Sequence, residues 1–273
     1  MSHPFVFRPG TNDEAMFRHF VAHDEYRLPE RFGPEDIVVD VGVHIGSFCY
    51  VALQRGAGRV YGFEAEPSNY ECARRNLEAF GDRIHLTNRA VWRSDQPGGR
   101  VPFSYCDDRA NTGGGSVLWE SDGPSIEAVP FDDVLEEITD GGRRRIRMLK
   151  IDCEGSEFPI LLTARRLDLI DYIAGEFHEI GCARNPQIIP DHARVPGVEA
   201  FTIEALDGCL RRAGFDVAFE RHGDSNLGLF YARRPLHRRT LGGRLKTFWQ
   251  HLSRKHQPMS AARTAGVASR TEA

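Results

Sequence analysis

The sequence predicts an α/β protein with a doubly wound sheet, mostly parallel, that has one antiparallel strand near its C-terminal end. Runs of apolar, β-branched residues alternate with helix-like segments from about residue 36 onward. A glycine turn, Gly42 to Gly46, leads from the first run into a helix. The last two runs, 215–221 and 226–234, follow one another without a helix between them, which predicts a closing hairpin.

The remaining elements follow in order along the chain. Residues 1–35 predict a helical cover, in which Asn12 or Asp13 caps an apolar stripe. Pro67 at a first turn and Gly81 past an end mark the second helix of the alternating series. Glycines, serines and short alternating runs at 98–131 predict a small antiparallel β insertion. Strands are predicted at 36–42, 59–66, 83–92, 145–155 and 170–180, and helices at 46–57, 67–81, 131–138, 156–165 and 198–214.

Composition predicts one domain, residues 1–234, and a basic tail, residues 235–273. Hydrophobic residues make up 41% of the chain and charged residues 27%, which is ordinary for a globular protein. No apolar run is long enough to span a membrane, no signal peptide is visible, and the six cysteines form no C-x-x-C pair. We therefore expect a cytoplasmic protein with reduced thiols and no structural zinc.

Charge is distributed unevenly between the body and the tail. Residues 233–273 carry ten Lys or Arg and one acid, whereas the rest of the chain carries 25 basic and 38 acidic residues. An acidic body argues against nucleic acid as the partner. The tail predicts a basic amphipathic helix at 241–252, which would contact an anionic membrane surface or a protein, and disorder beyond Pro258.

The glycine turn and an acid on the next strand predict a nucleoside ligand. Ligands of doubly wound sheets bind at the carboxyl ends of the strands, where the stretch "IVVDVGVHIGSF" lies. His44 stands where a dinucleotide-binding turn has a glycine, so a pyrophosphate is not expected. The amides that open the helix favour a carboxylate, and Glu64, which ends the second strand, suits a ribose diol. S-adenosylmethionine has these parts, although Glu64 would also serve as a helix cap.

Three stretches carry a resemblance to a known family: "VVDVGVHIGSF", "VYGFEAEPSNYECARRNL" and "LKIDCEGSEFPIL". With "GEFHE" after them, and the weaker "HDEY" and "NRAV", the chain resembles the FkbM-type S-adenosylmethionine-dependent methyltransferases from about residue 10 to 233. The family usually has asparagine where this chain has His44. The resemblance implies a class I methyltransferase sheet and methyl transfer mostly to hydroxyls of sugars, glycolipids, polysaccharides or polyketide-type metabolites.

The resemblance also implies cofactor-binding residues. Glu64 would hold the ribose hydroxyls, and Tyr26 would cover the cofactor, although simple packing also explains Tyr26. Asn88 would lie beside the adenine, or else only form a turn. The methionine end would be framed by Asp40, Gly42, His44 and Gly46, and the adenine would also touch Ala90.

Methyl transfer to a hydroxyl needs a base that removes the hydroxyl proton. Candidates end the fourth and fifth predicted strands, where alternation groups them on one side. We expect His178 to be the base, with its basicity raised by Glu176. Each candidate also has a structural explanation as an ion pair, a helix cap or a core histidine. The acids would suit a divalent metal, but their spacing is no metal signature, and no metal ligand is assigned. The predicted catalytic residues are His178, Asp152, Glu154, Lys150 and Glu176.

Two other functions compete with methyl transfer. A nicotinamide-dependent oxidoreductase would use a similar sheet, but the missing third glycine and the closing hairpin argue against it. The other alternative is a cofactor-binding or scaffold protein that has lost activity, and the retention of every motif counts against it. Binding of S-adenosylhomocysteine but not NAD would set the oxidoreductase aside, and binding of neither would favour a scaffold.

Overall fold

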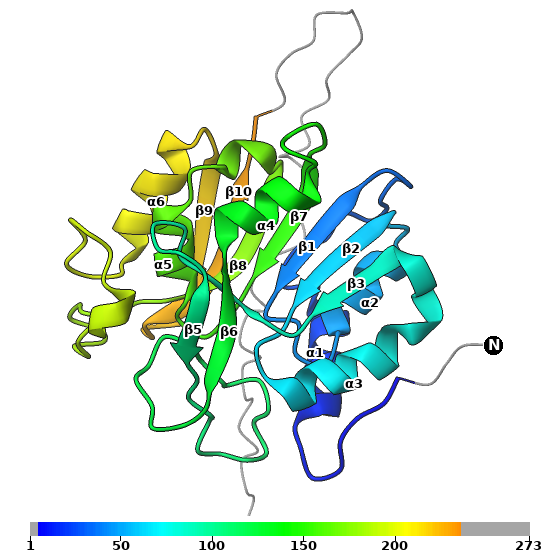
Figure 1. Cartoon of the computed structure of the whole chain (residues 1–273), viewed down its shortest axis with the longest axis horizontal. Helices are drawn as coiled ribbons and strands as arrows, with labels where there is room; N and C mark the ends of the chain where they lie inside the picture. The colour runs from blue at the N-terminus through cyan, green and yellow to red at the C-terminus, as the bar shows by residue number, and fades with distance from the viewer. Residues whose placement is uncertain (1–4, 236–273) are drawn as a thin grey trace, which may run out of the picture. The chain divides into compact units, whose positions relative to one another are not determined.

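Seven strands form the main sheet in the order β3-β2-β1-β7-β8-β10-β9 (Figure 1). The computed structural model describes residues 5–235, so the predicted tail helix and the region beyond Pro258 lie outside the described residues. The main strands are β1 (Ile37–Val41), β2 (Arg59–Phe63), β3 (Ile84–Thr87), β7 (Ile146–Ile151), β8 (Tyr172–His178), β9 (Asp216–Arg221) and β10 (Leu227–Arg233). The helices are α1 (Asp13–His23), α2 (Ser47–Gln54), α3 (Pro67–Leu77), α4 (Phe131–Ile138), α5 (Glu157–Thr163) and α6 (Ile203–Arg212).

One strand of the main sheet runs against the others. The pairs β3–β2, β2–β1, β1–β7 and β7–β8 are parallel, whereas β10 is antiparallel to both β8 and β9. The hairpin between β9 and β10 places β10, the last strand within residues 5–235, inside the sheet between β8 and β9. This order confirms the predicted fold class and differs from the all-parallel dinucleotide-binding sheet.

The prediction of one strand at 83–92 is wrong. The chain leaves the main sheet after β3 and enters a second, three-stranded sheet of β4 (Ala90–Trp92), β5 (Gly99–Pro102) and β6 (Ser125–Pro130). Asn88 lies between β3 and β4, and its side-chain amide donates to the carbonyls of Glu64 and Ala65. These bonds hold the turn that separates the two strands. Within the predicted insertion β5 and β6 are antiparallel, and β4, which precedes the insertion, pairs with β6 in parallel.

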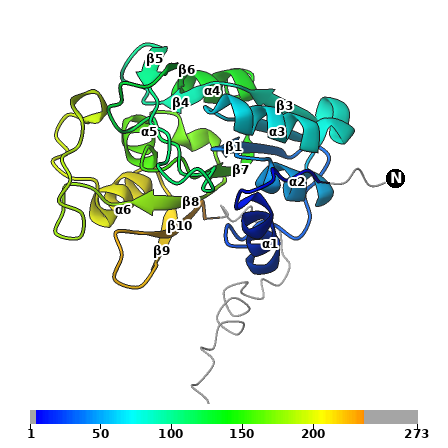
Figure 2. The ribbon, with the colours of Figure 1, turned by 90° about the horizontal axis from the view of Figure 1, so that it is seen from below.

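Two apolar cores cover the two faces of the main sheet. Side chains of β1 alternate between them, so that Val39 and Val41 face one core and Val38 faces the other. The first core contains side chains of α4, α5, α6 and the small sheet, and the second contains side chains of α1, α2 and α3. Figure 2 shows this division, with β5 and β6 on the side of the molecule opposite α1. Among residues 5–235, no helix combines the length and the apolar character needed to cross a membrane.

A buried ion pair joins the two central strands. Asp40 of β1 and Lys150 of β7 are direct partners in the parallel register, and Lys150 Nζ lies 3.2 Å from Asp40 Oδ1. Both side chains are almost completely buried. The ammonium also donates to the carbonyl of Gly42, just beyond the end of β1. Burial would lower the pKa of Lys150, but Asp40 and Asp152 outweigh burial and raise it, so that Lys150 remains a cation.

Lys150→Met should lower the free energy of unfolding by about 3–5 kcal/mol, because it leaves Asp40 buried without a counter-charge. Denaturant unfolding measures this loss. Adding Asp40→Asn to Lys150→Met should recover much of it, since the buried charge is then gone as well. Arg143→Met, which breaks an exposed pair with Asp140, is the control and should leave stability almost unchanged. Equal losses in the single and double variants would contradict the coupling.

Candidate functional site

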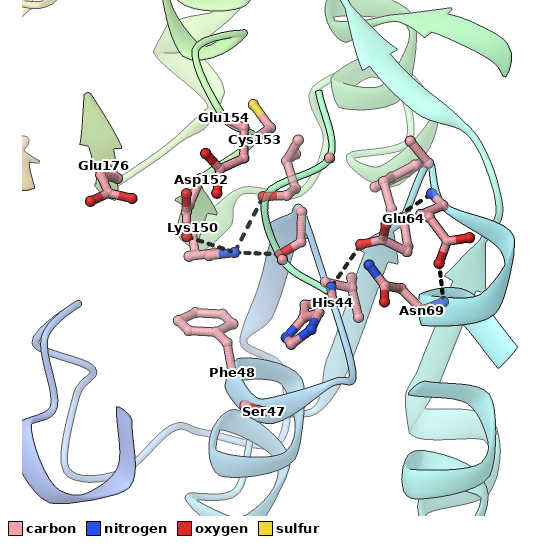
Figure 3. A pocket seen from close by; sticks show the side chains of 18 of the residues that line it. His44, Ser47, Phe48, Glu64, Asn69, Lys150, Asp152, Cys153, Glu154 and Glu176 are labelled. Carbon is pink, nitrogen blue, oxygen red and sulfur yellow. Dashed lines mark hydrogen bonds and ion pairs between the residues drawn. The ribbon is translucent and has the colours of Figure 1, made fainter. Parts of the chain in front are cut away.

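A cavity of about 590 Å³ opens at the carboxyl ends of the central strands. Its volume is in the usual range for small-molecule sites. Figure 3 shows Glu64 and Asn69 on one side of it, and Asp152, Glu154 and Glu176 on the other. Side chains of α1, of the segment that follows α1 and of the insertion also line it, among them Asn12, Phe20, Tyr26, Phe103 and Val117. The cavity is therefore assembled from segments far apart in the sequence.

Close backbone contact explains the glycine that opens the turn. Gly42 has φ +83°, and a Cβ there would lie 1.8 Å from the carbonyl oxygen of Asp152. The turn after β1 and the chain after β7 are thus in direct contact. His44 has φ +55°, a left-handed conformation that asparagine and histidine adopt more readily than most residues. The conformation accounts for a histidine where related sequences usually have asparagine.

The ring of His44 connects the turn to two covering segments. Its Nε2 lies 2.7 Å from Thr112 Oγ1 in the insertion and 3.5 Å from Asp13 Oδ1 at the start of α1. Arg8 also donates three hydrogen bonds to the carboxylate of Asp13, two from its side chain and one from its backbone, and this carboxylate is fully buried. Burial would raise the pKa of Asp13, but the donors around it outweigh burial and lower it. Asp13 therefore stays ionised and holds three segments together at one edge of the cavity.

Glu64 presents a fixed carboxylate to the cavity. One oxygen accepts the backbone N–H of His44 at 2.7 Å, and the other accepts that of Glu66 at 2.9 Å. Burial raises the pKa of Glu64, and the two N–H donors reduce this effect. Each oxygen keeps a lone pair, so the carboxylate can still accept hydrogen bonds from a ligand.

Asn69 is a site residue that the sequence did not indicate. It is only 4% exposed, and its side-chain amide donates to the carbonyl of Thr112. Asn69 lines the same side of the cavity as Glu64, and its buried Oδ1 has no hydrogen-bond partner among residues 5–235. A buried acceptor without a donor is costly, which favours a ligand that supplies one. The sequence places Asn69 in the first turn of a helix but gives no sign of its burial.

Three acids lie together on the opposite side of the cavity. The Asp152 carboxylate accepts a hydrogen bond of 2.7 Å from the Tyr26 hydroxyl. Burial would raise the pKa of Asp152, but Lys150 and Tyr26 outweigh burial and lower it. Burial, reinforced by the charge of Asp152, raises the pKa of Glu154 to about 7 and that of Glu176 to about 9. The cavity thus holds one ionised acid beside two that bind protons more tightly.

Glu154 is held in an unusual backbone conformation. Strand β7 ends at Ile151, before the predicted end at 155, and Glu154 and Gly155 both have positive φ, +54° and +97°. Ser116 of the insertion donates to the Glu154 carbonyl at 2.7 Å. Left-handed non-glycine residues cost about 1–3 kcal/mol and occur often at functional sites.

His178 lies behind these acids and does not line the cavity. Its Nε2 is 3.6 Å from Glu154 and 3.8 Å from Glu176, and its Nδ1 is 3.6 Å from Glu157. Burial alone would lower the pKa of His178, but these carboxylates, with Glu157 first, raise it to about 10. The ring is therefore a cation at neutral pH, which argues against the predicted role of His178 as a base.

The predicted site residues fall into two groups. Tyr26, Gly42, His44, Glu64, Ala90, Lys150, Asp152, Glu154 and Glu176 line the cavity, whereas Asp40, Gly46, Asn88 and His178 do not. Asp40 acts through Lys150, and Asn88 holds the turn after β3. Among the described residues, no group of three or more His, Cys, Asp or Glu side chains is placed to hold a metal ion.

Solved structures with a related arrangement of elements are distant from this chain. An rRNA methylase from Streptococcus thermophilus is 12% identical, with 85% of this chain and 99% of that one covered and a TM-score of 0.40. M. capricolum TrmK in complex with S-adenosylhomocysteine is 12% identical, with 79% and 68% covered and a TM-score of 0.42. An O-methyltransferase family protein from Burkholderia thailandensis is 11% identical, with 81% and 57% covered and a TM-score of 0.42.

A family comparison is more specific than these structures. Among curated proteins, no sequence matches the chain significantly. The family model described as the methyltransferase FkbM domain matches residues 40–217, which is more than half of the chain and includes the glycine turn, Glu64 and the three acids. The chain therefore belongs to the FkbM family of S-adenosylmethionine-dependent methyltransferases.

Proposed function

We propose that the protein transfers a methyl group from S-adenosylmethionine to a hydroxyl of a sugar, glycolipid, polysaccharide or secondary metabolite. The observation that carries this proposal is Glu154, a cavity-lining acid whose pKa of about 7 suits proton removal near neutral pH. Family membership sets aside the nicotinamide-dependent oxidoreductase.

The residues on the Glu64 side fit the cofactor. The Glu64 carboxylate would accept both ribose hydroxyls, and the unpartnered Oδ1 of Asn69 supplies a further acceptor for the nucleoside. The turn from Gly42 to Gly46, which opens α2, would lie at the amino-acid end. When bound, the cofactor supplies an electrophilic methyl group on a sulfonium. Ala90 would lie beside the adenine, and Tyr26 would cover the site from the N-terminal segment.

The residues on the opposite side would orient and deprotonate the acceptor. Asp152, kept ionised by Lys150 and Tyr26, would accept a hydrogen bond from the acceptor. Glu154 would take the proton of the reacting hydroxyl as the oxygen attacks. His178 would then stabilise the ionised form of Glu154 as a cation rather than act as the base. Glu176, with a pKa of about 9, would be protonated and could donate a hydrogen bond to the acceptor.

Charge narrows the class of acceptor. Within residues 5–235, the Lys and Arg side chains that line the cavity are Lys150 and Arg89, and they are paired with Asp40 and Glu127. An acceptor with a phosphate near the reacting hydroxyl would meet acids instead of free cations. This favours a neutral or cationic acceptor and argues against nucleic acid.

Glu64→Gln should weaken S-adenosylhomocysteine binding at least about tenfold. Hydrogen bonds to a charged group contribute roughly 1.5–3 kcal/mol each, and glutamine keeps the size of the side chain but not the charge. Calorimetry measures the affinity, and NAD should not bind the wild type. Glu71→Gln, on the exposed side of α3, is the control and should bind normally. A folded Glu64→Gln protein with unchanged affinity would rule out the ribose assignment.

Glu154→Gln should lower turnover by about 10²–10⁴-fold and leave S-adenosylhomocysteine affinity nearly unchanged, because the residue lies on the acceptor side. The measurement is transfer of labelled methyl to a panel of sugar and glycolipid acceptors. Wild-type activity should rise with pH through about 7, as Glu154 loses its proton, and the variant should lack this rise.

Two comparisons make this test specific. Glu137→Gln, an exposed change on α4, should keep full activity. Normal turnover in Glu154→Gln would show that the base is another residue, with His178 and Asp152 tested next.

Chelator treatment tests the hypothesis of a divalent metal, since activity that is lost and then restored by magnesium requires one. Cofactor binding without turnover on any acceptor would favour the scaffold.

A further inference from the structure

A buried glutamate, Glu157, faces the inner side of His178. Glu157 is the first residue of α5, and its side chain is completely buried. One carboxylate oxygen accepts the backbone N–H of Cys153 at 2.7 Å. The other has no hydrogen-bond partner among residues 5–235 and lies 3.6 Å from His178 Nδ1, which also has none. Two buried polar atoms without hydrogen bonds thus lie 3.6 Å apart, one on each group.

The outer side of the same ring faces the cavity acids. His178 Nε2 lies 3.6 Å from Glu154 Oε2 and 3.8 Å from Glu176 Oε2, and both of these acids line the cavity. The imidazole therefore stands between one buried carboxylate and two that a substrate can reach. Glu157, in contrast, does not line the cavity and cannot touch a substrate there.

The arrangement has a direct electrostatic consequence. A buried carboxylate is costly unless a cation pairs with it, and His178 is the nearest cationic group to the free oxygen of Glu157. A protonated ring has two N–H donors, so it can direct one toward Glu157 and the other toward the cavity. That second, outward charge favours the ionised form of Glu154.

We propose that Glu157 is a positioning residue that holds His178 as an imidazolium, with Nδ1 turned inward and Nε2 turned toward Glu154 and Glu176. The pair thereby keeps Glu154 able to lose its proton at neutral pH. This inference rests on the proposed function only for the role of Glu154 as the base. The other charged groups that face the cluster are Asp152 and Lys150 after and within β7, His222 beyond β9 and Glu25 after α1.

The charges determine how the pKa values of His178 and Glu154 change when Glu157 is replaced. Glu157→Gln removes the carboxylate that raises the pKa of His178 most. Burial should then lower the pKa of the ring. As the ring becomes neutral near pH 7, Glu154 loses a favourable positive charge and its pKa should rise. An opposite charge at this range typically shifts a carboxyl by about 1–3 units, and we expect about one unit because Glu154 is a third exposed.

Nuclear magnetic resonance of the full chain with bound S-adenosylhomocysteine tests the inference without an acceptor. Histidine ring nitrogens and glutamate carboxyl carbons are labelled and followed against pH. In the wild type, His178 should stay doubly protonated through neutral pH. In Glu157→Gln, its midpoint should fall from about 10 to near neutral pH, and that of Glu154 should rise. Glu137→Gln should leave both midpoints unchanged.

Clear results would overturn the inference. A wild-type His178 that titrates near its ordinary pKa, or a midpoint that Glu157→Gln does not move, would show that Glu157 has only a packing role. If this variant fails to fold, Glu157→Asp, which keeps the charge but withdraws it from the ring, gives the same comparison, and an unmoved His178 midpoint overturns the inference. If both midpoints shift as expected while the pH dependence of methyl transfer stays the same, the pair is as inferred and Glu154 is not the base.

Discussion

The site depends on one buried cation, the ammonium of Lys150. It pairs with Asp40 across the junction of β1 and β7, donates to the Gly42 carbonyl of the glycine turn and lies 3.8 Å from Asp152. A charge at this depth is stable only because acids surround it, and the charge in turn favours the ionised forms of Asp40 and Asp152. Both the glycine turn after β1 and the first acid after β7 are therefore fixed by the same group.

Two backbone features connect Lys150 and its partners to the walls of the cavity. The absence of a side chain at Gly42 lets the β1 turn touch the Asp152 carbonyl, so the two sides of the site cannot shift independently. On each side, one residue that is not glycine is held with positive φ, His44 in the first turn and Glu154 in the second. The contacts of His44 with Thr112, and of Ser116 with the Glu154 carbonyl, hold these conformations from the insertion. Local strain is thus offset by contacts distant in sequence.

The parts of the site that depend on strand order could be predicted from the sequence. The buried residues and the contacts between them could not. The glycine turn, Glu64 and the acids after β7 follow strands whose apolar runs are plain, so their meeting at one edge was predictable. Asn69 and Glu157 lie on helices where one-dimensional patterns do not reveal an unpaired buried atom. The protonation state of His178 could not be predicted from the sequence either. Three carboxylates determine it together, one from the chain after β7, one from α5 and one from β8. Strand 83–92 was misread because the side chain of Asn88 bonds to the chain after β2, which no local pattern indicates.

The family match and the cavity do not cover the same parts of the chain. The match begins at Asp40, yet Asn12, Phe20 and Tyr26 line the cavity from before it. Tyr26 reaches the acceptor side directly through its bond to Asp152, and Asp13 connects the start of α1 to the turn through His44. The turn, Glu64 and the three acids therefore lie within the match, while part of the cavity wall comes from a segment before it. Because α1 and the segment after it line the cavity without taking part in the main sheet, they can vary without disturbing the strand order.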